Sequence, residues 1–239
     1  MRLIPRLDIK NNFVVKGINL EGLRKIGNPS DLLEKYYKQG ADEICLIDCV
    51  ASLYRRNNIF SIIENATKNL FIPLTVGGGI RSLKDIEQAL NSGADKVAIN
   101  SYATENPKFI LDASKKFGSS TIVSYIEAKK KSDSNWEVYK YFGREKTNID
   151  IVYWIEKVQE LGCGEILLTS IDHEGLQKGL DYNLLDTVIK TLKVPLIYSG
   201  GLSGAKEVQN IKKNYKNVSL SMSSILHYNK STLEKLKIK

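Results

Sequence analysis

Two acidic residues, Asp8 and Glu127, stand at the ends of short apolar runs, where they could act together on a substrate. The runs cover residues 3–7 and 121–126 and are typical of buried β-strands. Two carboxylates that face each other across a pocket suit general acid and base catalysis, because different surroundings can push their pKa values apart. The other interpretation is that each is a solvated acid at a strand end, and the spacing alone does not decide between them.

Glycine-rich turns after two other apolar runs form a second chemical pattern. Residues 77–79 read Gly-Gly-Gly, and residues 199–201 read Ser-Gly-Gly. Glycines at such turns let backbone N–H groups approach a phosphate, often at the start of a helix. More hydroxyl and amide donors follow the next run after each turn, at Asn100, Ser101, Ser223 and Ser224. The pattern predicts two anion sites and a long substrate with a phosphate at each end; tight turns without a ligand are the alternative.

Charged residues at the opposite ends of the runs form a third pattern. Glu43, Lys96 and Glu165 stand at the starts of strand-like runs, and Arg2 stands just before the first run. Buried charges are costly unless they are paired. We therefore expect these acids and bases to form mutual salt bridges, either for stability alone or as the gate of a passage along the axis of the fold.

These residues need a fold that brings many strand ends together. Apolar runs cover residues 3–7, 44–47, 72–76, 96–99, 121–126, 166–169, 194–198 and 218–222, and amphipathic stretches cover 31–39, 57–67, 83–91, 107–116, 149–161, 182–191, 205–214 and 231–237. This alternation predicts a parallel sheet. Eight such units in 239 residues favour an α/β fold, a (β/α)8 TIM barrel formed as one domain over residues 1–239. An open doubly wound sheet is the alternative, but the GxGxxG typical of its first turn does not occur.

The chain also repeats itself. Residues 39–46 match residues 161–168, and residues 72–80 match residues 194–202, both at an offset of 122. Two independent matches at one offset indicate that the barrel is built from two related half-barrels. In such a barrel, Asp8 and Glu127 would lie opposite each other at the catalytic end of the strands.

The composition excludes several classes of protein. Lys and Arg number 35 against 27 Asp and Glu, but the net charge of +8 is spread over helical stretches, so we expect no nucleic-acid partner. The run from Lys129 to Lys131 is followed by Ser-Asp-Ser-Asn, which predicts a solvated loop. No apolar stretch is long enough to span a membrane, and the first residues do not resemble a signal peptide, so we expect no membrane partner.

Cysteine and histidine residues give little evidence of a metal site. The 3 cysteines form no CxxC motif, which indicates a reducing cytoplasm and no disulfide framework. Cys45 and Cys49 are interpreted as small core residues. His173 could touch a substrate, whereas His227 could as well be structural. No HExxH or P-loop motif occurs, so we expect no metal and no cofactor.

Taken together, the motifs resemble the cyclase subunit of imidazole glycerol phosphate synthase, the HisF family. The likeness covers essentially the whole chain and is carried by residues 7–10, 14–24, 75–82, 93–101 and 164–170. It implies a carbon–nitrogen lyase of histidine biosynthesis that works as a heterodimer with a glutaminase. The glutaminase would dock at the amino-terminal face of the barrel and release ammonia into it.

The resemblance also implies roles for single residues. Ammonia would convert a bis-phosphate phosphoribulosyl-formimino aminoimidazole carboxamide ribotide to imidazole glycerol phosphate and the carboxamide ribotide. Asp8 and Glu127 match the catalytic carboxylates, and Lys16 lies in the loop, residues 14–28, that closes over the substrate. The other matched substrate-binding residues are Gly79, Asn100, Ser101, Thr169, Gly175, Gly201, Ser223 and Ser224, and the matched gate of the ammonia passage is Arg2, Glu43, Lys96 and Glu165.

Three departures from the family pattern leave the substrate open. Glu127 replaces the usual Asp, Leu176 replaces a residue with a hydroxyl group, and residues 48–56 replace a small polar turn. The extra methylene of Glu127 moves the carboxylate by roughly 1 Å, a displacement that can cost about a hundredfold in rate. These departures resemble a paralogous branch that uses the same ammonia supply to amidate a sugar in surface-polysaccharide assembly. A non-catalytic scaffold that only activates a glutaminase is a further alternative.

Overall fold

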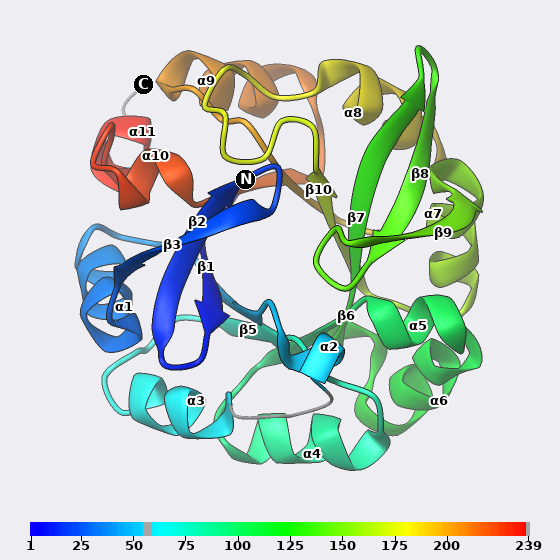
Figure 1. The fold of residues 1–239 in the computed structure, drawn as a ribbon, viewed down its shortest axis with the longest axis horizontal. Coiled ribbons are helices and arrows are strands. Elements are labelled where there is room, and N and C mark those ends of the chain that lie inside the picture. Colours follow the sequence, from blue (N-terminus) through cyan, green and yellow to red (C-terminus); the bar gives the residue numbers. More distant parts are fainter. Residues whose placement is uncertain (55–58, 238–239) are drawn as a thin grey trace.

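The computed structural model, which describes residues 1–54 and 59–237, has a closed barrel of parallel strands at its centre (Figure 1). Neighbouring strands pair in parallel around the ring, and the pairings of β1 with β12 and of β7 with β10 close it. The barrel strands are β1 (Leu3–Lys10), β4 (Ile44–Asp48), β5 (Leu74–Gly77), β6 (Lys96–Ile99), β7 (Ile122–Ser132), β10 (Glu165–Ser170), β11 (Leu196–Ser199) and β12 (Val218–Met222). The prediction of a (β/α)8 barrel is therefore confirmed.

Helices surround the strands on the outside (Figure 1). The longer ones are α1 (Pro29–Lys38), α3 (Phe60–Thr67), α4 (Leu83–Asn91), α6 (Lys108–Phe117), α7 (Ile151–Glu160), α8 (Tyr182–Val188) and α9 (Ala205–Asn214). Short helical segments are α2 (Ala51–Tyr54), α5 (Ser101–Glu105), α10 (Ser224–His227), α11 (Leu233–Lys237), η1 (Ser119–Thr121) and η2 (Ile189–Thr191). Side-chain caps begin several helices: the Ser82 hydroxyl, for example, accepts a hydrogen bond from the Asp85 backbone N–H at the start of α4.

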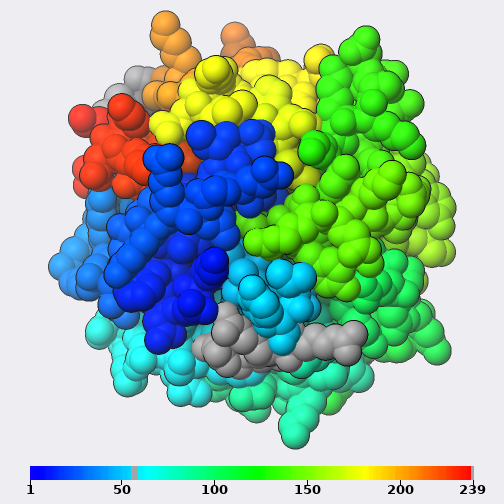
Figure 2. Space-filling model, viewed as in Figure 1, coloured from blue at the N-terminus to red at the C-terminus, as the bar shows by residue number. Residues whose placement is uncertain are grey.

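Two hairpins extend from the end of the barrel where the strands finish. In the first, β2 (Phe13–Ile18) pairs with both β1 and β3 (Glu21–Gly27); in the second, β8 (Asn135–Lys140) pairs with β7 and β9 (Glu145–Asp150). We call them the N-terminal hairpin and the central hairpin. In Figure 2 the N-terminal hairpin, coloured blue, lies against the yellow segment that follows β10 and covers part of the barrel mouth.

The core has two parts because successive side chains of a strand point to opposite faces. On β1, Leu3, Leu7 and Ile9 pack outward against the helices. Residues of the other parity point into the barrel, where Ile4 packs in a separate apolar cluster that includes Cys45, Val123, Leu167 and Ile197. Polar residues of the same inward parity, Arg6 and Asp8, follow Ile4 on β1 and lie above this cluster, towards the mouth.

The structure differs from the sequence predictions at several places. The expected loop at Lys129 to Lys131 is wrong: β7 continues to Ser132, because β8 pairs with its far end. β1 likewise continues past Asp8 to Lys10, where β2 pairs with it. The sequence patterns predict neither hairpin. Residues 57 and 58 of the expected helix 57–67, and Arg55 and Arg56 of the segment 48–56, lie outside the described residues.

Candidate active site at the barrel mouth

Glu127 is fully buried in the barrel mouth, on β7. Its Oε2 accepts hydrogen bonds from Asn100 Nδ2 at 3.0 Å and from the Gly143 backbone N–H at 2.9 Å. Burial raises the pKa of the Glu127 carboxyl to about 7, although interactions with Tyr125, Gly143 and Arg6 pull it down. The side chain can therefore gain or lose a proton near neutral pH, which suits a general acid or base.

Asp8 is buried on β1, and its surroundings differ from those of Glu127. The Arg6 guanidinium contacts it twice, with Nε at 3.0 Å from Oδ1 and Nη2 at 3.3 Å from Oδ2. Lys16 Nζ lies 3.2 Å from Oδ2. The negative charge of Asp8 raises the pKa of Glu127, so the two carboxyl groups influence each other within one site. One carboxylate is held by two cations, and the other carries an exchangeable proton.

Lys16 reaches into the site from the N-terminal hairpin. Besides Asp8, it pairs with the buried Glu174, which lies in the segment after β10. Burial alone would raise the pKa of Glu174, but the positive charges of Arg6 and Lys16 lower it to about 2. The Asn19 side chain donates hydrogen bonds to the carbonyls of Ile171 and Asp172, each at 2.8 Å, and thereby fixes the hairpin tip. The hairpin thus stands closed over the mouth.

The first predicted anion site is a small cavity beside Glu127. It is lined by Gly79, Asn100 and Ser101, as the sequence predicts, together with Ser52 and Tyr141. The Gly79 backbone N–H donates to the Ser52 hydroxyl at 3.2 Å, and the Tyr141 backbone N–H donates to the Ser101 hydroxyl at 3.0 Å. Uncharged N–H and hydroxyl donors therefore converge on this cavity.

The second predicted anion site is a still smaller cavity near the ends of β11 and β12. Gly175, Gly201, Ser223 and Ser224 all line it. A Cβ at Gly201 would come within 2.2 Å of the Gly179 carbonyl oxygen, and the φ of Gly201 is +90°, so only glycine fits there. The buried Ser224 hydroxyl has no hydrogen-bond partner among the described residues, which leaves it available to a ligand.

Besides Lys16, Thr169 is the predicted substrate-binding residue that belongs to neither cavity lining. Its hydroxyl instead accepts a hydrogen bond from Arg6 Nη1 at 2.9 Å, in the centre of the mouth. Sequence reasoning missed both Arg6 and Glu174. The inward parity that Arg6 shares with Asp8 on one strand was the available signal.

A ring of charges lies at the opposite end of the barrel. Lys96 Nζ contacts Glu43 Oε2 at 2.9 Å and Glu165 Oε2 at 2.8 Å. Arg2 pairs with the same two carboxylates, at 2.5 Å from Glu43 and at shorter range from Glu165. The structure thus brings together the four residues expected at this end, and their charges balance.

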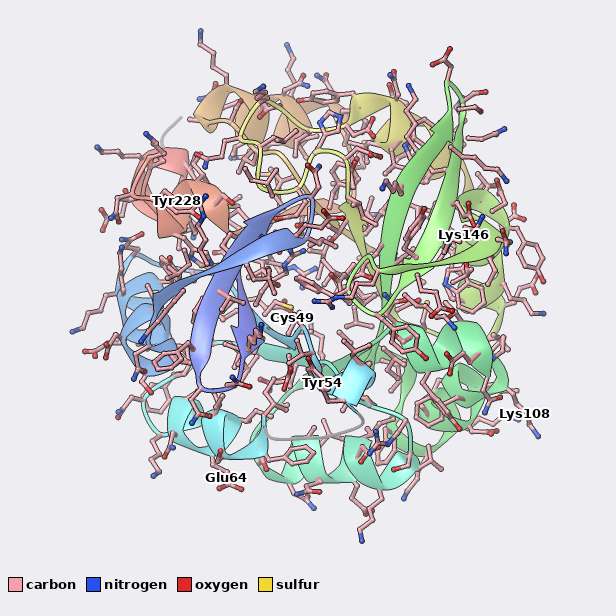
Figure 3. The ribbon with its side chains drawn as sticks, viewed as in Figure 1. Cys49, Tyr54, Glu64, Lys108, Lys146 and Tyr228 are labelled. Carbon is pink, nitrogen blue, oxygen red and sulfur yellow. The ribbon has the colours of Figure 1, made fainter. Side chains whose placement is uncertain are left out.

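The remaining residues singled out from the sequence lie at the edge of the site or outside it. His173 Nδ1 contacts the Gly179 carbonyl oxygen at 2.8 Å, and the buried His227 Nδ1 contacts the Tyr36 hydroxyl at 2.6 Å. Cys49 lies near the centre of the barrel as viewed in Figure 3, whereas Lys108 lies at the periphery. The Cys49 Sγ contacts the Ile9 carbonyl oxygen at 3.1 Å. In the described part of the chain, no group of three or more His, Cys, Asp or Glu residues could hold a metal.

Comparisons with known proteins give one consistent result. A family model described as "Histidine biosynthesis protein" matches residues 2–232. A protein of Legionella pneumophila named imidazole glycerol phosphate synthase subunit HisF is 51% identical over 207 residues, which is 87% of this chain and 98% of the relative. Proteins with the same name from Lactococcus lactis subsp. cremoris (strain MG1363) and Prochlorococcus marinus (strain MIT 9515) are 45% and 44% identical over 99% of this chain, covering 92% and 93% of their own lengths.

Proposed function

This chain belongs to the histidine biosynthesis protein family, and on that premise we propose that it is the cyclase subunit of imidazole glycerol phosphate synthase. The resemblance to the HisF family that the motifs predict is confirmed. The alternatives of sugar amidation and of a non-catalytic scaffold are not favoured, because the relatives carry the name of the histidine-pathway subunit.

The observation that best supports a lyase and cyclase reaction is the pair of buried carboxyl groups between two cavities lined by N–H and hydroxyl donors. The reaction takes ammonia and the bis-phosphate ribotide. Nitrogen replaces the ketone oxygen, which leaves as water, and then closes the imidazole ring as the carboxamide ribotide departs. Both departures need a proton, and both attacks release one.

Glu127 is suited to supply these protons, because its pKa of about 7 keeps it partly protonated at neutral pH. Asp8 accepts hydrogen bonds from two cationic side chains, and as an anion it would stabilise the positive charge that develops on the attacking nitrogen. The longer Glu127 side chain, in place of Asp, is held by Asn100 and Gly143 and still faces the same cavity as Gly79.

The two cavities would each receive one phosphate of the substrate. Gly79, Asn100 and Ser101 would bind the first, and Gly175, Gly201, Ser223 and Ser224 the second. The cluster of Lys16, Asp8 and Glu174 lies between the cavities, so the N-terminal hairpin must lift before a substrate can bridge them. Lys16 would then return to contact the bound substrate, as the resemblance predicts.

The relatives are named as subunits, so the enzyme of this family is an assembly that includes a further chain. We place a glutaminase on the amino-terminal face of the barrel, where the ring of Arg2, Glu43, Lys96 and Glu165 would gate ammonia. Two further features support this face. Phe71, which precedes β5 at that end, is 80% exposed, and a groove lined by Lys96 and Glu165 opens beside the ring. No described helix is long and apolar enough to cross a membrane.

Turnover of the bis-phosphate ribotide with an ammonium salt tests the catalytic proposal without a partner. We expect the purified chain to release imidazole glycerol phosphate and the carboxamide ribotide, and we expect Asp8→Asn and Glu127→Gln to lose at least about a hundredfold in kcat. Lys190→Met, which changes an exposed charge far from the mouth, is the control. Equal turnover by wild type and Asp8→Asn, or no turnover by a folded wild type that binds the ribotide, would refute the assignment.

A further inference from the structure

Arg6 is a fully buried arginine inside the barrel, and the function proposed above gives it no role. Arginine is almost never fully buried unless it is paired. The interior directly below it is apolar, with Ile4, Val123 and Leu167 in one cluster. A charged side chain at this depth requires compensation by specific partners.

Those partners come from several elements of the mouth. Nε and Nη2 contact the two carboxylate oxygens of Asp8. Nη1 donates to the Thr169 hydroxyl on β10 at 2.9 Å and to the Ser199 hydroxyl on β11 at 3.2 Å. Nη2 also lies 3.4 Å from Glu174 Oε1. Nη1 and Nη2 thus donate hydrogen bonds, while Nε lies at ion-pair distance from Asp8 Oδ1 without a hydrogen bond. These contacts hold the planar guanidinium and the Asp8 carboxylate against each other.

The second cation on Asp8 is held differently. Lys16 belongs to the N-terminal hairpin, whose tip is attached to the segment after β10 by the Asn19 hydrogen bonds. Lifting the hairpin to admit a substrate withdraws Lys16 from Asp8 and Glu174. Arg6 lies on β1, next to Asp8 in the barrel wall, and stays in place. It is therefore the cation that can hold Asp8 in both the open and the closed state.

We propose that Arg6 is a positioning residue of the reaction, which holds the Asp8 carboxylate at the centre of the mouth while the N-terminal hairpin opens and closes. This inference rests on the proposed function. It also explains the presence of Glu174, because the cations Arg6 and Lys16 and the anions Asp8 and Glu174 form a closed cluster without net charge.

The same guanidinium acts on Glu127 across the mouth. The groups that face Glu127 are Arg6 and Asp8 from β1, Tyr125 from β7, the Gly143 backbone N–H and the Asn100 amide. Among them Arg6 carries the positive charge that favours the ionised carboxylate. Removal of Arg6 should therefore make Glu127 bind its proton more tightly, an effect that a merely structural residue would not produce.

The test compares Arg6→Met, Arg6→Lys and the double variant Arg6→Met, Glu174→Gln in ammonium-dependent turnover across pH. Methionine keeps a long unbranched side chain, and the double variant removes one cation and one anion together, so that the cluster remains neutral and folding is protected. Urea denaturation checks folding in each case. We expect kcat to fall about a hundredfold in Arg6→Met and in the double variant, with a smaller change in KM for the ribotide. Arg6→Lys should restore part of kcat, because it returns the charge but only one contact point.

The pH dependence separates positioning from a structural role. In the profile of kcat against pH, one limb reflects the ionisation of Glu127. We expect this limb to move to higher pH in Arg6→Met and to keep its wild-type position in the control Lys190→Met. A ¹³C NMR titration of the Glu127 carboxyl measures the same shift without substrate. If a folded Arg6→Met variant kept the kcat and the pH profile of the wild type, this inference would be overturned, while the proposed function would stand. A wild type without turnover would overturn the proposed function, and the NMR titration would still decide whether Arg6 acts on Glu127.

Discussion

The raised pKa of Glu127 predicts that Glu127→Gln makes the protein more stable at alkaline pH, at the expense of activity. Glutamine has nearly the same shape, and its carbonyl oxygen can accept the hydrogen bonds from Asn100 and Gly143. Because it does not titrate, the variant removes the cost of ionising a fully buried carboxyl and changes little else.

The magnitude follows from the pKa in the two states. The ordinary value is 4.5, and the folded protein raises it to about 7. Below pH 4.5 both states of the wild type hold the proton, and the stabilising effect of the bound proton is fully present. As pH rises to 7 the unfolded state loses the proton first, so this stability is progressively lost. The pKa difference between the two states, at about 1.36 kcal/mol for each pH unit, corresponds to a loss of about 3 kcal/mol in the free energy of unfolding. This loss is complete above pH 8.

Urea denaturation followed by circular dichroism at pH 5 and pH 8.5 measures this difference. We expect the free energy of unfolding of Glu127→Gln, relative to wild type, to increase by about 2–3 kcal/mol between the two pH values. Glu156→Gln replaces an exposed glutamate on α7 and should show no comparable change. A gap between Glu127→Gln and wild type that stays constant with pH, or that shrinks as pH rises, would refute the assignment of a raised pKa to Glu127.

Lys96→Met leaves Arg2 as the one described cation that pairs with Glu43 and Glu165. It should therefore lower the free energy of unfolding by about 2–3 kcal/mol in urea denaturation. It should also lower glutamine-dependent turnover more than ammonium-dependent turnover, and an equal loss in both assays would contradict a gating role. Gly201→Ala should raise KM for the ribotide at least about tenfold, because its Cβ would press on the Gly179 carbonyl oxygen, and unchanged binding would count against the second anion site. Burial lowers the pKa of His227 to about 3, so its ring resonances should stay constant in NMR spectra from pH 8 to pH 5, whereas a titration near pH 6.5 would show that the ring is accessible to protons.

The barrel could be predicted from the sequence because its strands are buried on both faces. Strands such as Ile44–Asp48 and Val218–Met222 are wholly buried, and they read as continuous apolar or small-residue runs between helical patterns. The hairpin strands lack this signal. Glu21–Gly27 has no buried residue and contains charged and glycine residues, so its strand state depends on pairing with β2, which the local sequence does not show.

The site was predictable where residue type and position on a strand were sufficient. Asp8, Glu127 and the four charges at the other end of the barrel follow from strand ends and strand starts. Glu174 and the closed position of Lys16 do not, because they depend on how the N-terminal hairpin packs on the segment after β10. Arg6 is predictable in part. Its place on the strand predicts that it points inward with Asp8, but only the fold shows that Thr169 and Ser199 hold its guanidinium in place beside Asp8.

The net charge of +8 does not come from the charged residues inside the barrel. The ring at one end and the cluster around Arg6 at the other each balance two cations with two anions, so the excess positive charge lies elsewhere, on residues such as Lys108 at the periphery (Figure 3). Such surface charge is screened over about 8–10 Å at physiological salt and can only steer an anionic substrate from a distance.

Among the residues that the structure describes, the donors that line the two cavities are uncharged. Neither of the two proposed phosphate cavities has a lysine or arginine among its described lining residues, and the first one includes the Glu127 carboxyl. A phosphate bound in that cavity would disfavour a second negative charge beside it and would raise the pKa of Glu127 further. Substrate binding would then bring Glu127 to its protonated form, so the binding of the phosphate itself would load the general acid that the reaction needs.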